Sequence, residues 1–161
     1  MAWLNTPAGN TLITFLVSMV PVIELRGAIP IGVARGLNIW WAIGVSMVGN
    51  LVPVPFIILF IKKIFAWLRT WNEWFNNLVT RLELRAEDKR ETVERYAFWG
   101  LAILVAIPLP GTGAWTGSLV AAMMDMPLKK AFPAIVVGVV IAAVIVSVVT
   151  YGAQLMAYFV F

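Results

Sequence analysis

The chain has 161 residues, of which 61% are hydrophobic and only 12% are charged. Soluble domains average about 45–50% apolar and about 25% charged residues, so this composition excludes a soluble globular protein and indicates a lipid environment. Cys and His are both absent, which excludes a disulfide framework, a Cys/His zinc site, a thiolate nucleophile and an imidazole acid–base centre. We therefore expect a protein that is not an enzyme and that needs no cofactor or metal.

The net charge of +4 is distributed unevenly. Fourteen charged residues fall within residues 62–95, where acidic and basic side chains are mixed. Because nucleic-acid binding requires a basic stripe, we expect no nucleic-acid partner. Charge asymmetry in an apolar chain instead reports orientation across a membrane.

The first apolar segment is interrupted near its middle. A helical stretch over 11–20 stops at Pro21, and the chain resumes as a helix over 31–35. Each piece is too short to cross about 30 Å of hydrocarbon, and proline ends a helix by removing a donor. We predict a re-entrant helical hairpin over 11–36. No basic region precedes it and no cleavage pattern follows it, so we expect it to remain in the mature protein.

Residues 38–61 form an uninterrupted apolar stretch, longer than the roughly 20 residues that span a bilayer, and predict a transmembrane helix. In the connector that follows, 62–95, apolar residues recur at three- and four-residue spacing over 64–82 and include three Trp. Because Trp prefers the headgroup level, we predict one amphipathic helix lying in the interface, continued by a solvated helix over 83–95. We interpret the connector as an anchor; a regulatory basic helix is the alternative.

The second half repeats this order. An apolar helix stops at Pro108, a turn rich in Pro and Gly follows, and the chain resumes as a helix to Met124, which predicts a second re-entrant hairpin over 97–124. Residues 131–158 predict a second transmembrane helix. A shift of 87 places brings Pro21 onto Pro108 and Asn38 onto Asp125, with Val33 falling on Val120.

We therefore predict an all-α integral membrane protein with a single membrane domain over 1–161. It contains two inverted repeats, 10–61 and 97–161, joined by the connector. In an inverted arrangement the basic residues of the connector fall on the same side of the membrane as Lys129 and Lys130. Parallel repeats are the alternative; they place Lys129 and Lys130 on the opposite side and so weaken the positive-inside bias. We expect a multi-pass protein of the cell inner (plasma) membrane, with the connector cytoplasmic and both termini outside.

The first turn carries two ionisable residues, Glu24 and Arg26. Ionisable residues within a membrane segment are costly and are read as functional by default. We expect an unwound turn between Pro21 and Pro30, so that both side chains reach one cavity. They form either a structural ion pair or a substrate and proton site in which Glu24 carries the coupling proton.

The second turn offers backbone amides and hydroxyls instead of charge. Helix N-termini with free amides attract anions, and half-helices starting near Gly27 and Gly113 would aim two such ends at the midplane, with Arg26 between them. This convergence favours an anionic headgroup. The candidate substrate-binding residues are Arg26, Gly27, Gly111, Thr112, Gly113, Trp115 and Thr116.

Five other polar residues are weaker candidates. Asn38 and Asp125 suit caps of the spanning helices, with ion relay as the alternative, in which Asp125 joins Glu24 in proton or ion coupling. Asn50 lies near two prolines and could line the path at a kink. Tyr151, with Gln154, either faces the same path or forms hydrogen bonds between helices.

Two stretches carry a resemblance to a known family. Residues 21–30, PVIELRGAIP, and residues 108–117, PLPGTGAWTG, resemble the signature stretches of the small multidrug export protein family. More distantly the chain is similar to the DedA (VTT) superfamily. That resemblance implies inverted repeats whose half-helices meet at the midplane, and substrates such as polyprenyl phosphates and phospholipids, often with dependence on the proton gradient.

By motif position, the resemblance makes Glu24 and Arg26 the acidic and basic residues of the first hairpin. The second hairpin departs from the bacterial DedA pattern, because Thr112, Gly113 and Trp115 stand where that pattern has an Arg after the Pro-Gly turn.

We expect a transporter of an amphiphilic anion, of lipid-phosphate type, coupled to protons. The alternatives are proton-coupled export of cationic hydrophobic drugs and a non-transporting membrane scaffold. The expected partners are membrane lipids, the amphiphilic substrate and a second copy of the chain, because two full spans enclose little space.

Overall fold

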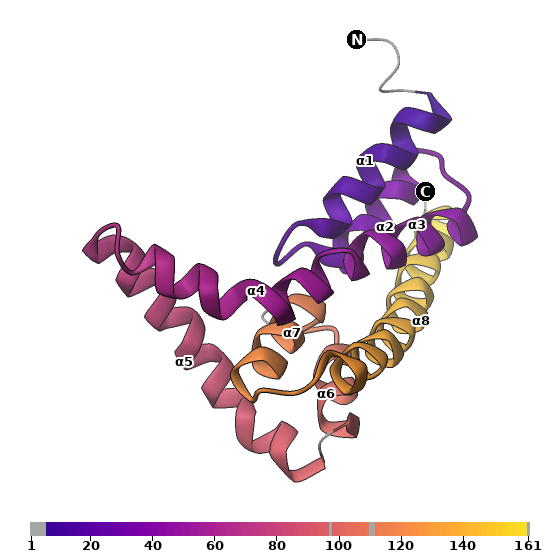
Figure 1. Cartoon of the computed structure of the whole chain (residues 1–161). Coiled ribbons are helices and arrows are strands. Elements are labelled where there is room, and N and C mark those ends of the chain that lie inside the picture. Colours follow the sequence, from indigo (N-terminus) through magenta and orange to yellow (C-terminus); the bar gives the residue numbers. More distant parts are fainter. Residues whose placement is uncertain (1–5, 97, 110–111, 161) are drawn as a thin grey trace.

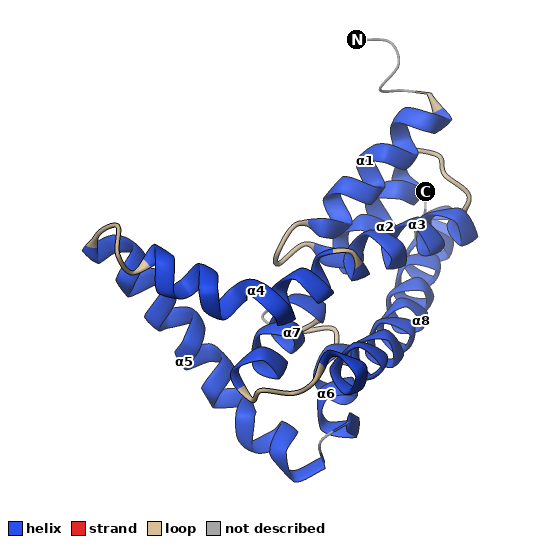
Figure 2. Cartoon of the chain, viewed as in Figure 1, coloured by secondary structure: helices blue, strands red, loops and turns tan. Residues whose placement is uncertain are grey.

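The computed structural model describes residues 6–96, 98–109 and 112–160, with side chains described outside residues 89–97 and 153–161. The described residues form eight α-helices and no strand, which confirms the all-helical prediction (Figure 2). Figure 1 shows α1, α2 and α3 grouped at one end, α6 and α7 further down, and α8 running along both groups. The α4–α5 pair extends away from them to one side.

The first hairpin consists of α1 (Pro7–Met19) and α2 (Glu24–Ala34). The Thr6 side chain accepts the amide of Gly9 and caps α1. At 1.5 Å per residue, the 13 residues of α1 extend about 20 Å, less than the hydrocarbon thickness. The far end of α2 returns to the start of α1, where the Asn10 amide donates to the Arg35 carbonyl oxygen at 2.7 Å and the Arg35 Nε donates back at 3.0 Å.

The turn of this hairpin is shorter than the sequence indicates. We expect the chain to stay unwound until Pro30, but α2 begins at Glu24 and contains Pro30 in its interior. A proline inside a helix costs roughly 3 kcal/mol because it removes a hydrogen bond. Burial of Leu25 and Ile29, which are at most 1% exposed, offsets that cost. The expectation of a long unwound turn is therefore wrong.

Among the described residues, two helical stretches are long and apolar enough to cross a membrane, and they lie where the sequence predicts the two spans. The first joins α3 (Ile39–Leu51) to α4 (Pro53–Leu68) over 30 residues, and its most apolar 18 residues have mean hydropathy 2.1. The second occupies most of α8 (Leu128–Val160), and its most apolar 18 residues have mean hydropathy 2.9. Only 28% and 39% of their most apolar windows are buried inside the molecule, so most of this apolar surface faces outward. Exposed apolar surface of this extent is typical of a membrane or partner contact and fits the expected lipid environment.

The connector is a helical hairpin and not one interfacial helix. The α4 helix continues through Lys62 to Leu68, and α5 (Glu73–Tyr96) starts after a turn in which the Asn72 side chain accepts the Phe75 amide at 3.1 Å. The predicted single helix over 64–82 is therefore wrong. The turn escapes detection because the apolar spacing continues across it.

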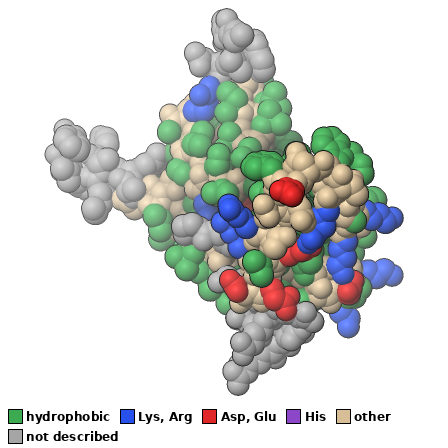
Figure 3. Space-filling model, turned by 90° about the vertical axis from the view of Figure 1, so that its left-hand side faces the viewer, with side chains coloured by type: hydrophobic (Ala, Val, Ile, Leu, Met, Phe, Trp, Pro, Cys, Tyr) green, Lys and Arg blue, Asp and Glu red, His purple; other side chains and the backbone are tan. Residues whose placement is uncertain are grey.

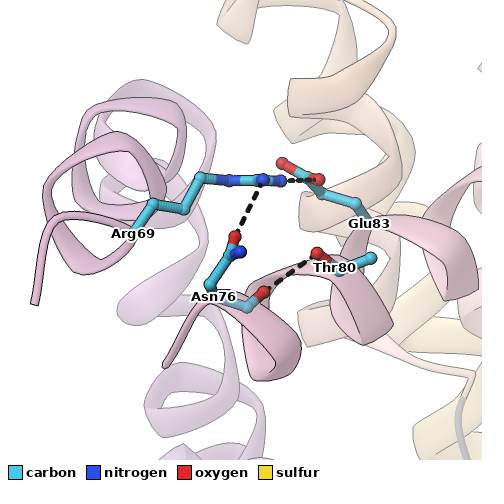
Figure 4. Close-up of polar contacts among 4 residues, drawn as sticks. All are labelled: Arg69, Asn76, Thr80 and Glu83. Atoms are coloured by element: carbon cyan, nitrogen blue, oxygen red, sulfur yellow. Dashed lines mark hydrogen bonds and ion pairs between the residues drawn. The ribbon is translucent and has the colours of Figure 1, made fainter. Parts of the chain in front are cut away.

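Polar contacts close the connector hairpin (Figure 4). Arg69 of α4 forms an ion pair with Glu83 of α5 and donates to the Asn76 side chain at 3.1 Å. Trp67 and Trp71 pack edge to face at the tip, with ring centroids 4.5 Å apart. Figure 3 shows the side of the molecule that lies on the left in Figure 1. Most charged side chains on this side gather on its lower part, with apolar side chains above them.

The second hairpin consists of α6 (Phe98–Ala106) and α7 (Ala114–Met123), and α6 packs along α8. The core shared by this hairpin and α8 includes Leu101, Val105, Ile135 and Val139, which are at most 1% exposed. The second helix of each hairpin also contacts the spanning segment of the other half: α7 packs on α4, and α2 packs on α8. The two halves therefore interlock.

The connections from hairpin to spanning helix have the same conformation in both halves. The φ and ψ angles are −85° and 8° at Arg35 and −84° and 5° at Met124. The next residues, Gly36 and Asp125, both have positive φ, 85° and 53°. The spanning helices then start at residues 39 and 128. All of these pairs are 89 residues apart.

The first helices of the hairpins are related by 87 residues instead. A Cβ added to Gly49 of α3 would lie 2.7 Å from the Phe15 carbonyl oxygen, and one added to Gly138 of α8 would lie 2.6 Å from the Ala102 carbonyl oxygen. The glycines are 89 residues apart, but their partners are 87 apart. The second turn is therefore two residues longer, and the predicted pairing of Asn38 with Asp125 is wrong.

Candidate functional site

Arg26 of the first hairpin holds the turn of the second. Its guanidinium donates to the carbonyl oxygens of Leu109 and Ile107, the latter at 2.8 Å, and to the Thr112 hydroxyl at 3.1 Å. A longer contact of 3.5 Å reaches the Val105 carbonyl oxygen in the last turn of α6. A helix leaves its last carbonyls without partners and carries a partial negative charge there, so a cation stabilises this end.

Trp115 of the second hairpin holds the first in return. Its indole Nε1 donates to the Met19 carbonyl oxygen at 3.0 Å, at the end of α1. Arg26 and Trp115 are 89 residues apart, the spacing that relates the two hairpin-to-span connections. Each hairpin thus offers one donor side chain to the carbonyl end of the other.

Glu24 occupies the amide end of α7. Its Oε1 accepts the backbone N–H of Trp115 at 3.0 Å, and the residue is 3% exposed. An acidic group near a helix N-terminus is stabilised by the helix dipole and the free amides. The protein's own carboxylate therefore lies where the sequence analysis expects an anionic headgroup.

Gly113 makes this close approach possible. Its φ of 121° is rare for any other residue, and an added Cβ would overlap the Glu24 carboxylate, lying 2.8 Å from its carboxyl carbon. Glu24 itself has φ of 50°, in the left-handed region. The Gly-rich turn predicts a free amide at Gly113, whereas here the residue makes room for the Glu24 side chain.

Glu24 and Arg26 do not form an ion pair with each other in the described part of the chain. Residues two apart at the start of a helix point in different directions, and these two reach opposite ends of the second turn. Glu24 and Arg26 are therefore not joined by a direct ion pair, and a structural role for both residues stays a prediction. Arg26 also keeps a buried Nε without a hydrogen-bond partner among the described residues.

A cavity of about 220 Å³ lies beside these contacts. Glu24, Thr112, Trp115 and Thr116 line it from the two hairpins. The end of the first span and the connector close the other side with residues of α4 and α5, which are Ile61, Phe65, Leu82, Arg85 and Ala86. The structure thus brings four of the predicted site residues to one cavity.

Two of the predicted substrate-binding residues, Gly27 and Gly111, are not among those that line the cavity in the described structure. The Gly27 amide donates to the Ile23 carbonyl oxygen at 3.0 Å, so this amide is used inside the helix. Gly111 lies outside the described residues.

Asp125 lies on the surface, away from the cavity. It is 84% exposed in its side chain and forms an ion pair with Lys62 at 2.7 Å, so it is not the cap that the sequence analysis expects for α8. Asn38 does cap α3, as predicted, by accepting the Trp40 amide at 2.9 Å. The proposed relay roles of both residues stay predictions.

The predicted path-lining residues do not meet in one place. Asn38 and Tyr151 line one groove of about 660 Å³ between α3 and α8, separate from the hairpin cavity. Asn50 is fully buried in α3, and both polar atoms of its side chain are without a partner among the described residues.

Sequence reasoning misses Arg85 entirely, because it belongs to a run of mixed charges that is typical of a solvated helix. Nothing in its local sequence distinguishes it from Arg81, one turn earlier, which does not line the cavity. Only the folding of α5 against α6 and α7 places Arg85 beside the hairpins.

Comparison with known proteins gives one family. No curated protein and no solved structure matches the chain. A sequence model of the family described as "Putative small multi-drug export protein" matches residues 24–145, a region that begins at Glu24 and includes the cavity-lining residues of both hairpins from there on. Because this match covers well over half of the chain, the protein belongs to that family of membrane proteins.

Proposed function

We propose that this protein is a transporter that moves an amphiphilic anion of the lipid-phosphate type across the membrane together with a proton. The observation that supports it is the Glu24 carboxylate at the amide end of α7, 3.0 Å from the Trp115 nitrogen. A helix end that holds a carboxylate also suits a phosphate. The substrate headgroup would take the place of Glu24.

The exchange couples the two binding events. Protonated Glu24 is neutral and loses its attraction to the α7 dipole, so its departure leaves the Trp115 amide free for the anion. A proton on Glu24 then favours the anion, and by linkage the anion favours the proton. Arg26, which stays beside the turn, keeps the site positive throughout.

The membrane arrangement is part of this proposal. Both hairpins re-enter the membrane from opposite sides and meet near its middle, as two inverted repeats. The Lys62–Asp125 ion pair puts the start of the connector beside the start of α8, which supports a common cytoplasmic side for Lys62 and Lys129. Both termini then lie outside, the membrane is the inner one, and two copies of the chain enclose the transport path.

The test is binding of undecaprenyl phosphate to the purified protein in detergent, measured by native mass spectrometry. We expect Glu24→Gln, which is neutral and mimics the protonated state, to bind at least as tightly as the wild type at neutral pH. Arg26→Ala should lose binding, and Arg26→Lys should keep part of it. Binding that is absent, or indifferent to both positions, would overturn the anion site. A melting temperature for each variant shows that it is folded.

Export of cationic hydrophobic drugs is a second candidate, favoured by the family's description. In that case Glu24 exchanges a proton for the drug. Glu24→Gln would then abolish proton movement driven by the drug, and Arg26→Ala would have a mild effect. This ranking is opposite to the one expected for an anion site.

A non-transporting scaffold is the third candidate, favoured by the structural contacts of Arg26 and Trp115 between the hairpins. It predicts that substitutions at Glu24 and Arg26 change stability and nothing else.

A further inference from the structure

Arg85 is a cation whose contacts in the described part of the chain set it apart from other connector cations. Among the described residues it forms no hydrogen bond and no ion pair, whereas Lys62 pairs with Asp125 and Arg69 pairs with Glu83. Its guanidinium is nonetheless carried by a side chain that lines the hairpin cavity. A planar guanidinium with free donors binds two oxygens of one phosphate or carboxylate at once.

The position of Arg85 is fixed by its helix. The next residue, Ala86, is 2% exposed and Val79 is 1% exposed, so one face of α5 is packed, while the Arg85 side chain beside it is exposed. The same helix contacts α6 and α7. The connector is therefore a wall of the cavity as well as a link between the two halves.

The cavity selects the size of a ligand. Pockets for drug-sized molecules usually measure about 300–1,000 Å³, and this one measures about 220 Å³. It therefore holds a compact headgroup and leaves the rest of the molecule outside. Most of its lining is apolar, and Val22 at its edge is 80% exposed, which suits an alkyl or prenyl chain leaving the cavity.

We infer that Arg85 binds the anionic headgroup of the substrate. The inference rests on the proposed function and deepens it, because it adds the connector to the binding site. Thr116 provides a hydroxyl group on the hairpin side of the same cavity, whereas the Thr112 hydroxyl already donates to the carbonyl oxygens of the turn.

The test is the affinity of the purified full chain in detergent for dodecyl phosphate, measured by isothermal titration calorimetry. The variants are Arg85→Ala and Arg85→Lys. The matched control is Arg81→Ala, which removes the same charge from the same helix one turn away. We expect Arg85→Ala to raise the Kd about tenfold or more, as loss of a charge-assisted hydrogen bond does. Arg85→Lys should lose less, and Arg81→Ala should stay within about twofold of the wild type.

Further ligands separate the sources of binding. Inorganic phosphate should compete only weakly, because it lacks the chain, and dodecyl trimethylammonium should bind independently of Arg85. If Arg85→Ala behaves like Arg81→Ala while Arg26→Ala loses binding, the inference about Arg85 is overturned and the proposed function stands. If the wild type does not bind dodecyl phosphate at all, the proposed function fails. Equal competition by inorganic phosphate would overturn the claim that the ligand is an amphiphile and would indicate a site for a free oxyanion.

Discussion

The two halves of the molecule share a backbone geometry but differ in what they bury. In the first half, Thr14 and Ser18 on α1 and Ser46 and Asn50 on α3 are fully buried. The corresponding positions of the second half, at spacings of 87 for the first helix and 89 for the spanning helix, are apolar. They are Leu101, Val105, Ile135 and Val139, and they are equally buried.

This difference shows that the helix packing itself does not require polar side chains. The second half packs the same way with Leu, Val and Ile. Burying polar groups away from water costs free energy unless they find partners, yet the Ser46 hydroxyl and the Asn50 amide have none among the described residues. Such groups are usually satisfied by buried water. The first half, which also carries Glu24, is therefore the half in which we expect water.

The largest expected effect comes from the contact that joins the halves. Gly113→Ala would place a Cβ against the Glu24 carboxylate at a backbone conformation that only glycine favours. We expect the free energy of unfolding to fall by about 2–5 kcal/mol, or the variant to fail to fold. Thermal unfolding in detergent measures it. The control is Gly44→Ala, where an added Cβ meets nothing within 4 Å and the change should be neutral or slightly stabilising. Equal effects of the two variants would contradict the contact.

The next effect tests the shared geometry. Gly49→Ala forces a Cβ to within 2.7 Å of a backbone carbonyl oxygen of α1, and Gly138→Ala forces one to within 2.6 Å of a backbone carbonyl oxygen of α6. We expect both to cost about 1–3 kcal/mol, and to cost similar amounts, because overpacking of backbone cannot be relieved by a rotamer change. The same melting assay checks them. A large loss at one glycine and none at the other would show that the halves do not pack alike.

Exchanging polar and apolar core residues tests the difference between the halves. Asn50→Leu removes a buried amide without a protein partner in the described structure, so stability should stay level or rise by about 1–2 kcal/mol. Val139→Asn, at the corresponding position, should cost about 1–3 kcal/mol, because it buries an amide in an apolar core. Opposite signs in thermal unfolding are the expected result. Equal losses at both positions would mean that Asn50 has a structural partner.

The smallest effect belongs to the surface. Lys62→Ala breaks an ion pair in which the Lys62 side chain is about half exposed and the Asp125 side chain is mostly exposed. We expect the free energy of unfolding to fall by less than about 1 kcal/mol. The loss should shrink further in high salt, because exposed charges are screened. Melting at two salt concentrations measures it, and Lys63→Ala is the control. A salt-independent loss would argue that the pair is buried in the membrane-bound protein.

The sequence by itself determined the segmentation of this protein. Long apolar runs identified both spanning helices, and Pro and Gly placed both hairpin turns, since these residues alter the backbone locally wherever they occur. Asn38 could be recognised as a cap for the same reason. The ionisable pair Glu24 and Arg26 also stood out, because charge in an apolar segment is rare.

Only the tertiary structure decided what those residues contact. The helix through Pro30 depends on burial against other helices, and the turn at Asn72 leaves the apolar spacing unchanged, so local patterns predict neither. The partners of Arg26 are backbone carbonyls about 80 residues away, which carry no mark in the sequence. Arg85 reaches the cavity for the same reason: its place is set by the packing of α5 and not by its neighbours along the chain.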